Sequence, residues 1–224
     1  HFTDYLYNNG GAIIGEDERG IPQTPVKSTF STPAVIETLQ FLNDLYEKDK
    51  VGSPHFTNDM YQAFQKGQVG MLIEAQWLIP WTLSAAPDLD FGIAPIPTPT
   101  GEAPEVRADS WIMVVSAKSD PAVKEYAWKF LNEYVSTSQY DMLKAALSVP
   151  TRNDIVESKD LDWIESFYAS YLQGATRVKP FHKQWEEIER RVEPILAEMY
   201  LGDLSPRDTA EAIDMEIESI LAGY

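Results

Sequence analysis

Hydrophobic residues recur with two different periods along residues 1–150. Apolar side chains three or four positions apart predict helices over 33–48 and 57–66. Short apolar or alternating runs predict strands over 69–73, 89–94 and 111–116. Strands that are interleaved with helices are typical of an α/β fold.

Start and stop signals define the helix boundaries. Thr32-Pro33, Asp120-Pro121 and Ser205-Pro206 each place a capping side chain before a proline that suits the first turn. Gly67 is placed to end the helix over 57–66. The helix that starts at Pro121 should bury one face, which consists of Val123, Ala127, Phe130, Leu131 and Tyr134. Further helices are predicted over 2–7, 78–85, 139–147, 160–172, 184–201 and 206–221.

The second half of the chain is predicted to be almost entirely helical. Pro194 lies inside the helix over 184–201 and should kink or break it. Three or four strands are few for a complete doubly wound sheet with this many helices. The chain also opens on His1, without an initiator Met and inside a helix-like stretch. We therefore expect a processed or partial chain that lacks an N-terminal portion.

Composition excludes several functions. The net charge of −17, from 35 acidic and 18 basic residues, argues against nucleic acid as a partner. Cysteine is absent, so neither a disulfide nor a thiolate metal site can form, and the compartment is left open. No apolar run approaches the roughly 18 to 20 residues of a membrane span.

Motifs for cofactors and metals are missing as well. The glycines fit neither type of phosphate-binding loop, and there is no Gly-x-Ser-x-Gly elbow. His1, His55 and His182 are far apart and lie in no metal-ligand pattern. We expect neither a metal nor a cofactor, and no catalytic residue stands out.

A carboxylate, an amide and an indole follow the predicted strand over 69–73. Glu74, Gln76 and Trp77 stand where ligands bind in open α/β sheets, beyond the carboxyl ends of the strands. An apolar ring face and polar edges are what a sugar needs for stacking and hydrogen bonding. The alternative is that Trp77 is a core residue that caps the sheet.

Similar residues stand at three other junctions between turns and regular elements. Asp109, Ser110 and Trp111 precede a predicted strand, Arg152 follows a proline, and Trp185 opens a helix. Each of these alone could be a packing or capping residue. Their shared position at element ends favours one ligand site at one end of the sheet.

Short sequence motifs occur along nearly the whole chain in a recognisable order. They are Asn9-Gly10-Gly11, Phe64-Gln65-Lys66-Gly67-Gln68-Val69-Gly70-Met71, Trp77, Phe91-Gly92-Ile93-Ala94-Pro95-Ile96-Pro97, Asp109-Ser110-Trp111, Tyr126-Ala127-Trp128-Lys129-Phe130-Leu131, Val149-Pro150-Thr151-Arg152 and Leu201-Gly202-Asp203-Leu204-Ser205-Pro206. In this order they resemble the C-terminal part of family 1 of the extracellular solute-binding proteins, the maltose-binding-protein-like receptors of ABC sugar importers. Asp109 stands where the family often has Gly, and Ala75-Gln76 where Gly-Pro often precedes the Trp.

The resemblance implies a two-lobed periplasmic-binding-protein fold (type II-like, α/β), represented by its C-terminal part with a helical tail. Residues 1–107 would belong to the C-terminal lobe, 108–150 would cross into the N-terminal lobe, and 151–224 would return. A sugar or oligosaccharide would bind in the cleft between the lobes, in contact with the residues singled out above. Asp109, Trp111 and Arg152 would then lie near one another at the lobe crossings.

The resemblance also implies partners and a location. The protein would be a non-catalytic monomer that works with the permease subunits of an ABC importer. It would lie outside the cytoplasm, either in the periplasm or as a lipoprotein, after removal of a signal peptide from its precursor. A chain that carries only part of the cleft should bind sugar weakly or not at all.

Two other classes of function stay open. One is a glycoside-active enzyme that uses a cleft carboxylate such as Glu74 or Asp109. The other is an acidic helical interaction module with no small ligand. Incubation with oligosaccharides tests the first, because only an enzyme cleaves them, and a thermal-shift screen against sugars tests the second.

Overall fold

The computed structural model describes residues 2–17, 21–52, 59–101, 104–107, 112–147, 152–156 and 176–223. The chain forms two compact units. Unit 1 consists of His1–Asp59, Ala94–Ala108 and Ala175–Tyr224, and unit 2 consists of Met60–Ile93 and Asp109–Gly174. This division differs from the predicted lobe boundaries for residues 60–93, which cluster with the central segment of the chain. The lobe assignment itself stays a prediction.

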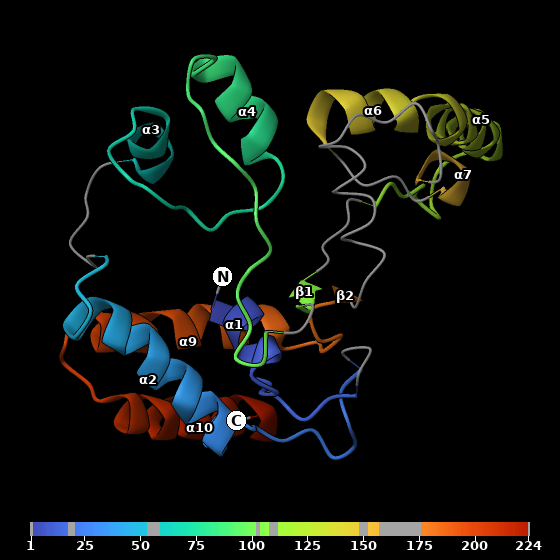
Figure 1. Cartoon of the computed structure of the whole chain (residues 1–224). Helices are drawn as coiled ribbons and strands as arrows, with labels where there is room; N and C mark the ends of the chain where they lie inside the picture. Colours follow the sequence, from blue (N-terminus) through green and yellow to red (C-terminus); the bar gives the residue numbers. More distant parts are fainter. Residues whose placement is uncertain are drawn as a thin grey trace. The chain divides into compact units, whose positions relative to one another are not determined.

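Unit 1 is built on helices from the two ends of the chain. They are α1 (Phe2–Asn8), α2 (Pro33–Glu47), α9 (Trp185–Tyr200) and α10 (Pro206–Ala222). Helix α10 packs on both α9 and α2, so the helical tail packs against an N-terminal helix of the same unit (Figure 1).

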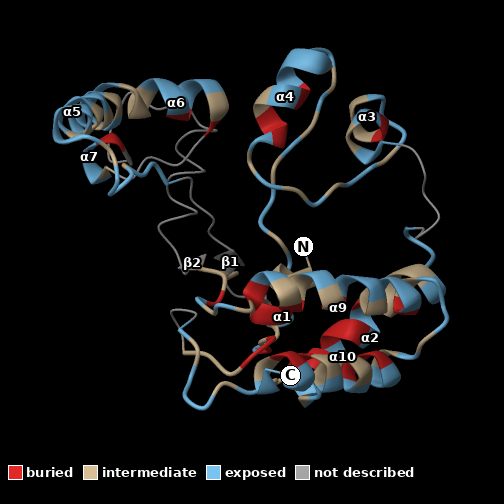
Figure 2. Cartoon of the chain, turned by 180° about the vertical axis from the view of Figure 1, so that it is seen from behind, coloured by how far each residue is buried: buried red, intermediate tan, exposed pale blue. Residues whose placement is uncertain are grey.

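One apolar face of α10 explains this packing. Ala210, Ile213, Ile217 and Ile220 recur every three or four positions and are fully buried. At the start of the helix, the Ser205 hydroxyl accepts a hydrogen bond from the Asp208 amide at 3.1 Å. Figure 2 shows the buried residues of unit 1 gathered on its helices. The rest of this core comes from Leu6, Ile13, Ile14, Phe30, Val35, Leu39, Trp185, Ile188, Val192 and Met199.

A short parallel strand pair, β1 (Val106–Arg107) and β2 (Thr176–Arg177), completes unit 1. Beside it, the Arg177 guanidinium pairs with the fully buried Glu16 carboxylate at 2.7 Å and with Glu105 at 3.6 Å. The same guanidinium lies 4.2 Å from the centre of the Tyr7 ring. This cluster links segments that are up to 161 positions apart in the sequence.

The described residues of unit 2 form short to medium helices. They are α3 (Met60–Gln65), α4 (Leu78–Ala85), α5 (Pro121–Thr137), α6 (Gln139–Ala146) and α7 (Asn153–Val156). Within the described chain, α3 packs on α4 and α5 packs on α6.

Most helix predictions are confirmed. The Asp120 side chain accepts a hydrogen bond from the Ala122 amide at 2.8 Å, as a capping residue should. Gly67 ends α3 with a positive φ of 68°. Thr32 precedes α2 as predicted, but its side chain makes no capping hydrogen bond. Helix α9 continues through Pro194 without a break, and the predicted helix over 160–172 lies outside the described residues.

The predictions of strands over 69–73, 89–94 and 111–116 are wrong wherever the structure describes them. The described residues of all three segments have neither strand nor helix hydrogen bonding, and Met71 is 87% exposed. An apolar run indicates only a tendency toward burial, whereas a strand also needs a second strand with which its backbone forms hydrogen bonds. Among the described residues, only β1 and β2 form a sheet.

The predicted buried face of α5 is also wrong. The helix has no buried residue (Figure 2). Val123 and Phe130, for example, are exposed. Helical spacing places these side chains on one face, but burial requires a neighbouring element that covers it. Helix α6 covers only part of α5.

Candidate functional site

Three aromatic rings form a cluster in unit 2. The indole rings of Trp77 and Trp81 are stacked, with centroids 5.7 Å apart and planes inclined by 25°. The Tyr61 ring meets them edge-on, at 5.1 Å from Trp77 and 5.6 Å from Trp81. Both indoles are about two-fifths exposed, at 42% and 41%. We call Tyr61, Trp77 and Trp81 the aromatic platform.

Local helix geometry positions the platform. Trp77 precedes the first residue of α4 and Trp81 lies four positions later, so both side chains project from the same face of the helix. The opposite face holds Leu78, Ile79 and Thr82, which are buried. Helix α4 therefore anchors its apolar face and presents two indoles to solvent.

A carboxylate lies directly beside the platform. The Tyr61 hydroxyl donates a hydrogen bond to Glu74 Oε2 at 2.9 Å, and the Ala75 amide donates to Glu74 Oε1 at 2.8 Å. Each oxygen of Glu74 can accept more than one hydrogen bond, so the group can still bind a ligand hydroxyl. Stacking faces and a fixed acceptor together suit a sugar ring, which has apolar faces and polar edges.

Sequence reasoning identified Trp77 and Glu74 but missed Tyr61 as a member of the site. Tyr61 lies on α3, 13 positions before Glu74, and the intervening chain reverses at Gly67. Trp81 is a further ring of the platform that was not among the predicted site residues. Its spacing of four residues within a predicted helix was the signal that could have placed both rings on one face.

The remaining predicted site residues fall into three groups. Gln76 is partly buried and lies directly beside the platform in the sequence. Arg152 also belongs to unit 2, but its guanidinium is already held by Asp154, at 3.0 and 2.6 Å, and by the Ser136 carbonyl at 2.8 Å. Asp109, Ser110 and Trp111 lie outside the described residues, so their predicted proximity to Arg152 stays a prediction.

The pair of Arg152 and Asp154 has an electrostatic signature. The hydrogen bond from Arg152 holds the pKa of the Asp154 carboxyl below its usual value, and the carboxylate raises the pKa of Arg152. This reciprocity is typical of a bidentate ion pair. A ligand that used the Arg152 guanidinium would have to share it with Asp154.

Trp185 lies in a different setting. Its side chain is only 7% exposed and packs in the apolar core of unit 1. Within the described chain, its indole nitrogen is buried without a hydrogen-bond partner. This burial favours a packing role over the predicted contact with a ligand.

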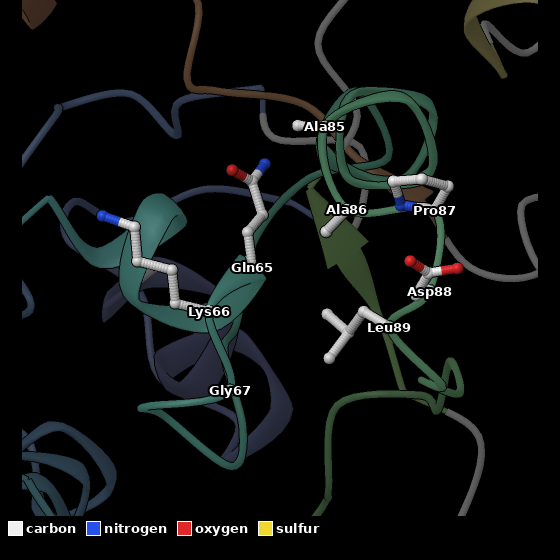
Figure 3. A pocket seen from close by; sticks show the side chains of 8 residues that line it. All are labelled: Gln65, Lys66, Gly67, Ala85, Ala86, Pro87, Asp88 and Leu89. Atoms are coloured by element: carbon white, nitrogen blue, oxygen red, sulfur yellow. The ribbon is translucent and has the colours of Figure 1, made fainter.

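A hollow of about 440 Å³ lies between the ends of α3 and α4 (Figure 3). Its lining consists of Gln65, Lys66, Gly67, Ala85, Ala86, Pro87, Asp88 and Leu89. The hollow is shallow and has no aromatic wall. The aromatic platform is therefore the stronger candidate for a ligand surface.

The part of the chain that the structure describes offers neither a metal site nor a membrane-spanning helix. No three His, Asp or Glu side chains there are grouped so that they could hold a metal ion. No described helix combines the length and the apolar character that a bilayer crossing requires.

The fold is similar to that of the matching part of sugar-binding proteins of known structure. Maltose-bound MalE3 of T. maritima covers 98% of this chain with a TM-score of 0.77 and 21% identity, and 56% of its own length is matched. The cyclic alpha-maltosyl-1,6-maltose binding protein of Arthrobacter globiformis covers 100% of this chain with a TM-score of 0.73 and 20% identity, over 55% of its length.

The chain belongs to the family of bacterial extracellular solute-binding proteins, whose model matches residues 1–141. Among curated relatives, a protein of Brucella abortus (strain 2308) named "Putative binding protein BAB2_0491" is 28% identical over 207 residues. The match covers 87% of this chain and 48% of that protein. The chain thus spans about half the length of the curated relatives it matches. The family predicted from the sequence is confirmed.

Proposed function

We propose that this protein is part of the substrate-binding component of an ABC importer and that it binds a sugar or oligosaccharide without reacting with it. The observation that carries the proposal is the aromatic platform beside Glu74. It supplies two indoles that are each about two-fifths exposed, and a fixed hydrogen-bond acceptor, within one unit. Family membership and the likeness to sugar-binding structures support the same function.

The proposed mode of binding follows from the chemistry of sugars. The C–H groups of a pyranose ring pack against the indole of Trp77 or Trp81, and a hydroxyl at the ring edge donates to Glu74. Gln76, Arg152 and the segment Asp109-Ser110-Trp111 are proposed to complete the hydrogen bonding. The cleft between two lobes is proposed to exclude water around the sugar, which strengthens these polar contacts.

Partners and location follow from the proposed transport role. The permease subunits of an importer are the expected partners, and the protein would lie outside the cytoplasm, as the family's description indicates. Free diffusion in a periplasm and anchoring by a lipid are both compatible with this role. The lobes are proposed to divide at residues 107/108 and 150/151.

The test is a titration of the complete product of the gene that encodes this chain. Isothermal titration against maltose, maltotriose and other oligosaccharides should give saturable binding for at least one sugar. Trp77→Ala should weaken that binding by more than about tenfold, because it removes stacking and apolar burial together. Trp128→Ala is the matched control, since Trp128 is 55% exposed on a different helix, α5, and its loss should leave binding unchanged.

Two results would overturn the proposal. The first is a sugar affinity that Trp77→Ala and Trp128→Ala change equally. The second is the absence of binding to every sugar of the panel. Chromatography of the same oligosaccharides after incubation should return them intact, because a receptor releases its ligand unchanged. Cleaved products would instead support the glycoside-active enzyme.

A further inference from the structure

A partly open pocket lies in unit 1, the unit that does not contain the aromatic platform. It has a volume of about 300 Å³. Helices α1 and α2 and the proline-rich segment that follows residue 96 form its walls. The lining residues are Tyr5, Asn9, Glu37, Thr38, Phe41, Pro97, Thr98 and Pro99.

The interior of this pocket is mainly apolar. The rings of Tyr5 and Phe41 are tilted against each other with centroids 5.7 Å apart. Pro97 and Pro99 add two rings whose backbone is restricted. Phe41 is 47% exposed, so part of an aromatic surface remains available to a ligand.

The polar groups at the base of the pocket are engaged with one another. Asn9 Nδ2 donates to the Ala34 carbonyl at 2.9 Å and to Thr38 Oγ1 at 3.3 Å. The Thr38 hydroxyl donates to the same carbonyl at 2.8 Å, and Thr38 is only 3% exposed. Because the Asn9 amide and the Thr38 hydroxyl are already used in these bonds, they are not the groups that select a ligand.

Glu37 is the charged group of the pocket. Helix α2 carries two other acids, and both pair with lysines: Asp44 with Lys48 at 3.7 Å and Glu47 with Lys50 at 3.6 Å. The Glu37 carboxylate forms neither an ion pair nor a hydrogen bond within the described chain, and Glu37 lies four positions before Phe41 on the same helix face. The lining contains no basic side chain.

From this arrangement we infer that the pocket is a docking site for an arginine or lysine side chain from a basic segment of a partner protein. The alkyl stem of that side chain packs against Pro97, Pro99 and the ring of Phe41. Its cationic head lies over an aromatic ring and pairs with the Glu37 carboxylate. The net charge of −17 attracts a basic partner in the same way.

The inference can be tested with the 224-residue chain labelled with ¹⁵N and a short peptide, Gly-Ser-Arg-Ser-Gly with blocked ends. Amide resonances of residues around Tyr5, Phe41 and Thr98 should shift saturably as the peptide is added. Replacing the arginine of the peptide by citrulline, which has nearly the same shape without the charge, should weaken binding by about two- to fivefold, the size of one exposed ion pair.

Protein variants locate the effect. Glu37→Gln should weaken binding of the arginine peptide by about the same two- to fivefold and leave binding of the citrulline peptide unchanged. Glu211→Gln is the matched control, because Glu211 is another exposed glutamate near the start of a helix of unit 1. Phe41→Ala should weaken binding of both peptides, since it removes the ring against which the alkyl stem of the peptide side chain packs.

Three outcomes would overturn the inference. Equal binding of the arginine and citrulline peptides would show an apolar groove that does not recognise charge. Equal weakening by Glu37→Gln and Glu211→Gln would show a general attraction to an acidic surface. Shifts that avoid the pocket residues would place the peptide elsewhere. Because the pocket belongs to unit 1, none of these outcomes bears on sugar binding at the platform.

Discussion

At the scale of single residues, Tyr61 has two separable roles in the platform. Its ring contacts both indoles, and its hydroxyl holds Glu74. Tyr61→Phe keeps the ring and removes only the hydrogen bond, so sugar affinity should fall by about fivefold, which corresponds to about 1 kcal/mol. Tyr61→Ala should cost more because the indoles lose their edge contacts. Titration calorimetry of both variants checks this, and equal losses would show that the ring contributes nothing.

Glu16 is the residue whose burial should make stability depend on pH. Burial raises the pKa of its carboxyl above the usual 4.5, although the Arg177 guanidinium acts in the opposite direction. A carboxyl with a raised pKa binds its proton more tightly in the folded state. Its stabilising contribution is therefore fully present below about pH 4.5 and is lost as the pH rises through the folded-state pKa.

Glu16→Gln should remove this dependence, because the amide does not titrate. Urea unfolding of the wild type and of the variant between about pH 4 and pH 8 gives the difference in unfolding free energy. We expect the wild type to lose stability relative to the variant as the pH rises. Parallel curves over the whole range would contradict the assigned pKa direction.

At the scale of elements, Pro194 is the clearest conflict between sequence and structure. It lies on the exposed side of α9, and it has no amide to donate to the carbonyl one turn earlier. Pro194→Ala should therefore stabilise the protein, by up to about 3 kcal/mol. Urea unfolding measures the gain, with Glu193→Ala at the neighbouring exposed position as the control. A loss of stability would show that a proline bend is needed for α9 to fit against α10.

Elements with local signals could be predicted from the sequence, and elements that depend on distant partners could not. Helices α2, α4, α6 and α10 follow from apolar spacing, prolines and capping residues that lie within a few positions of one another. The strand predictions failed because a strand is defined by a neighbour that no local pattern specifies. The same limit applies to the exposed face of α5, whose burial depends on what packs against it.

The candidate site could be predicted only in part for the same reason. Trp77 and Glu74 adjoin the start of α4, so position alone indicated them. Tyr61 contacts Trp77 and Glu74 only because the chain reverses between α3 and α4. A short sequence motif does not indicate such a reversal. Trp185 had a similar position at the start of a helix, but it is buried because α9 turns that face toward α10.

At the scale of the whole molecule, the core of unit 1 joins helices from both ends of the chain. Ile217 on α10 is fully buried in this core, whereas Met215 on the same helix is 74% exposed. Ile217→Ala should cost about 2–5 kcal/mol of unfolding free energy, because it leaves a cavity between helices. Met215→Ala should change it by less than about 0.5 kcal/mol. Denaturant unfolding compares the two, and similar losses would mean that this core is not the main source of stability.

The stacked indoles of Trp77 and Trp81 also have an optical consequence. Two identical chromophores at a centroid distance of 5.7 Å couple their excited states, so we expect a paired positive and negative band in the ultraviolet circular dichroism of the protein. A molecule that packs against one ring changes the angle or the polarity that governs this pairing. The platform therefore carries its own optical reporter, and occupancy can be followed without any label attached to the protein.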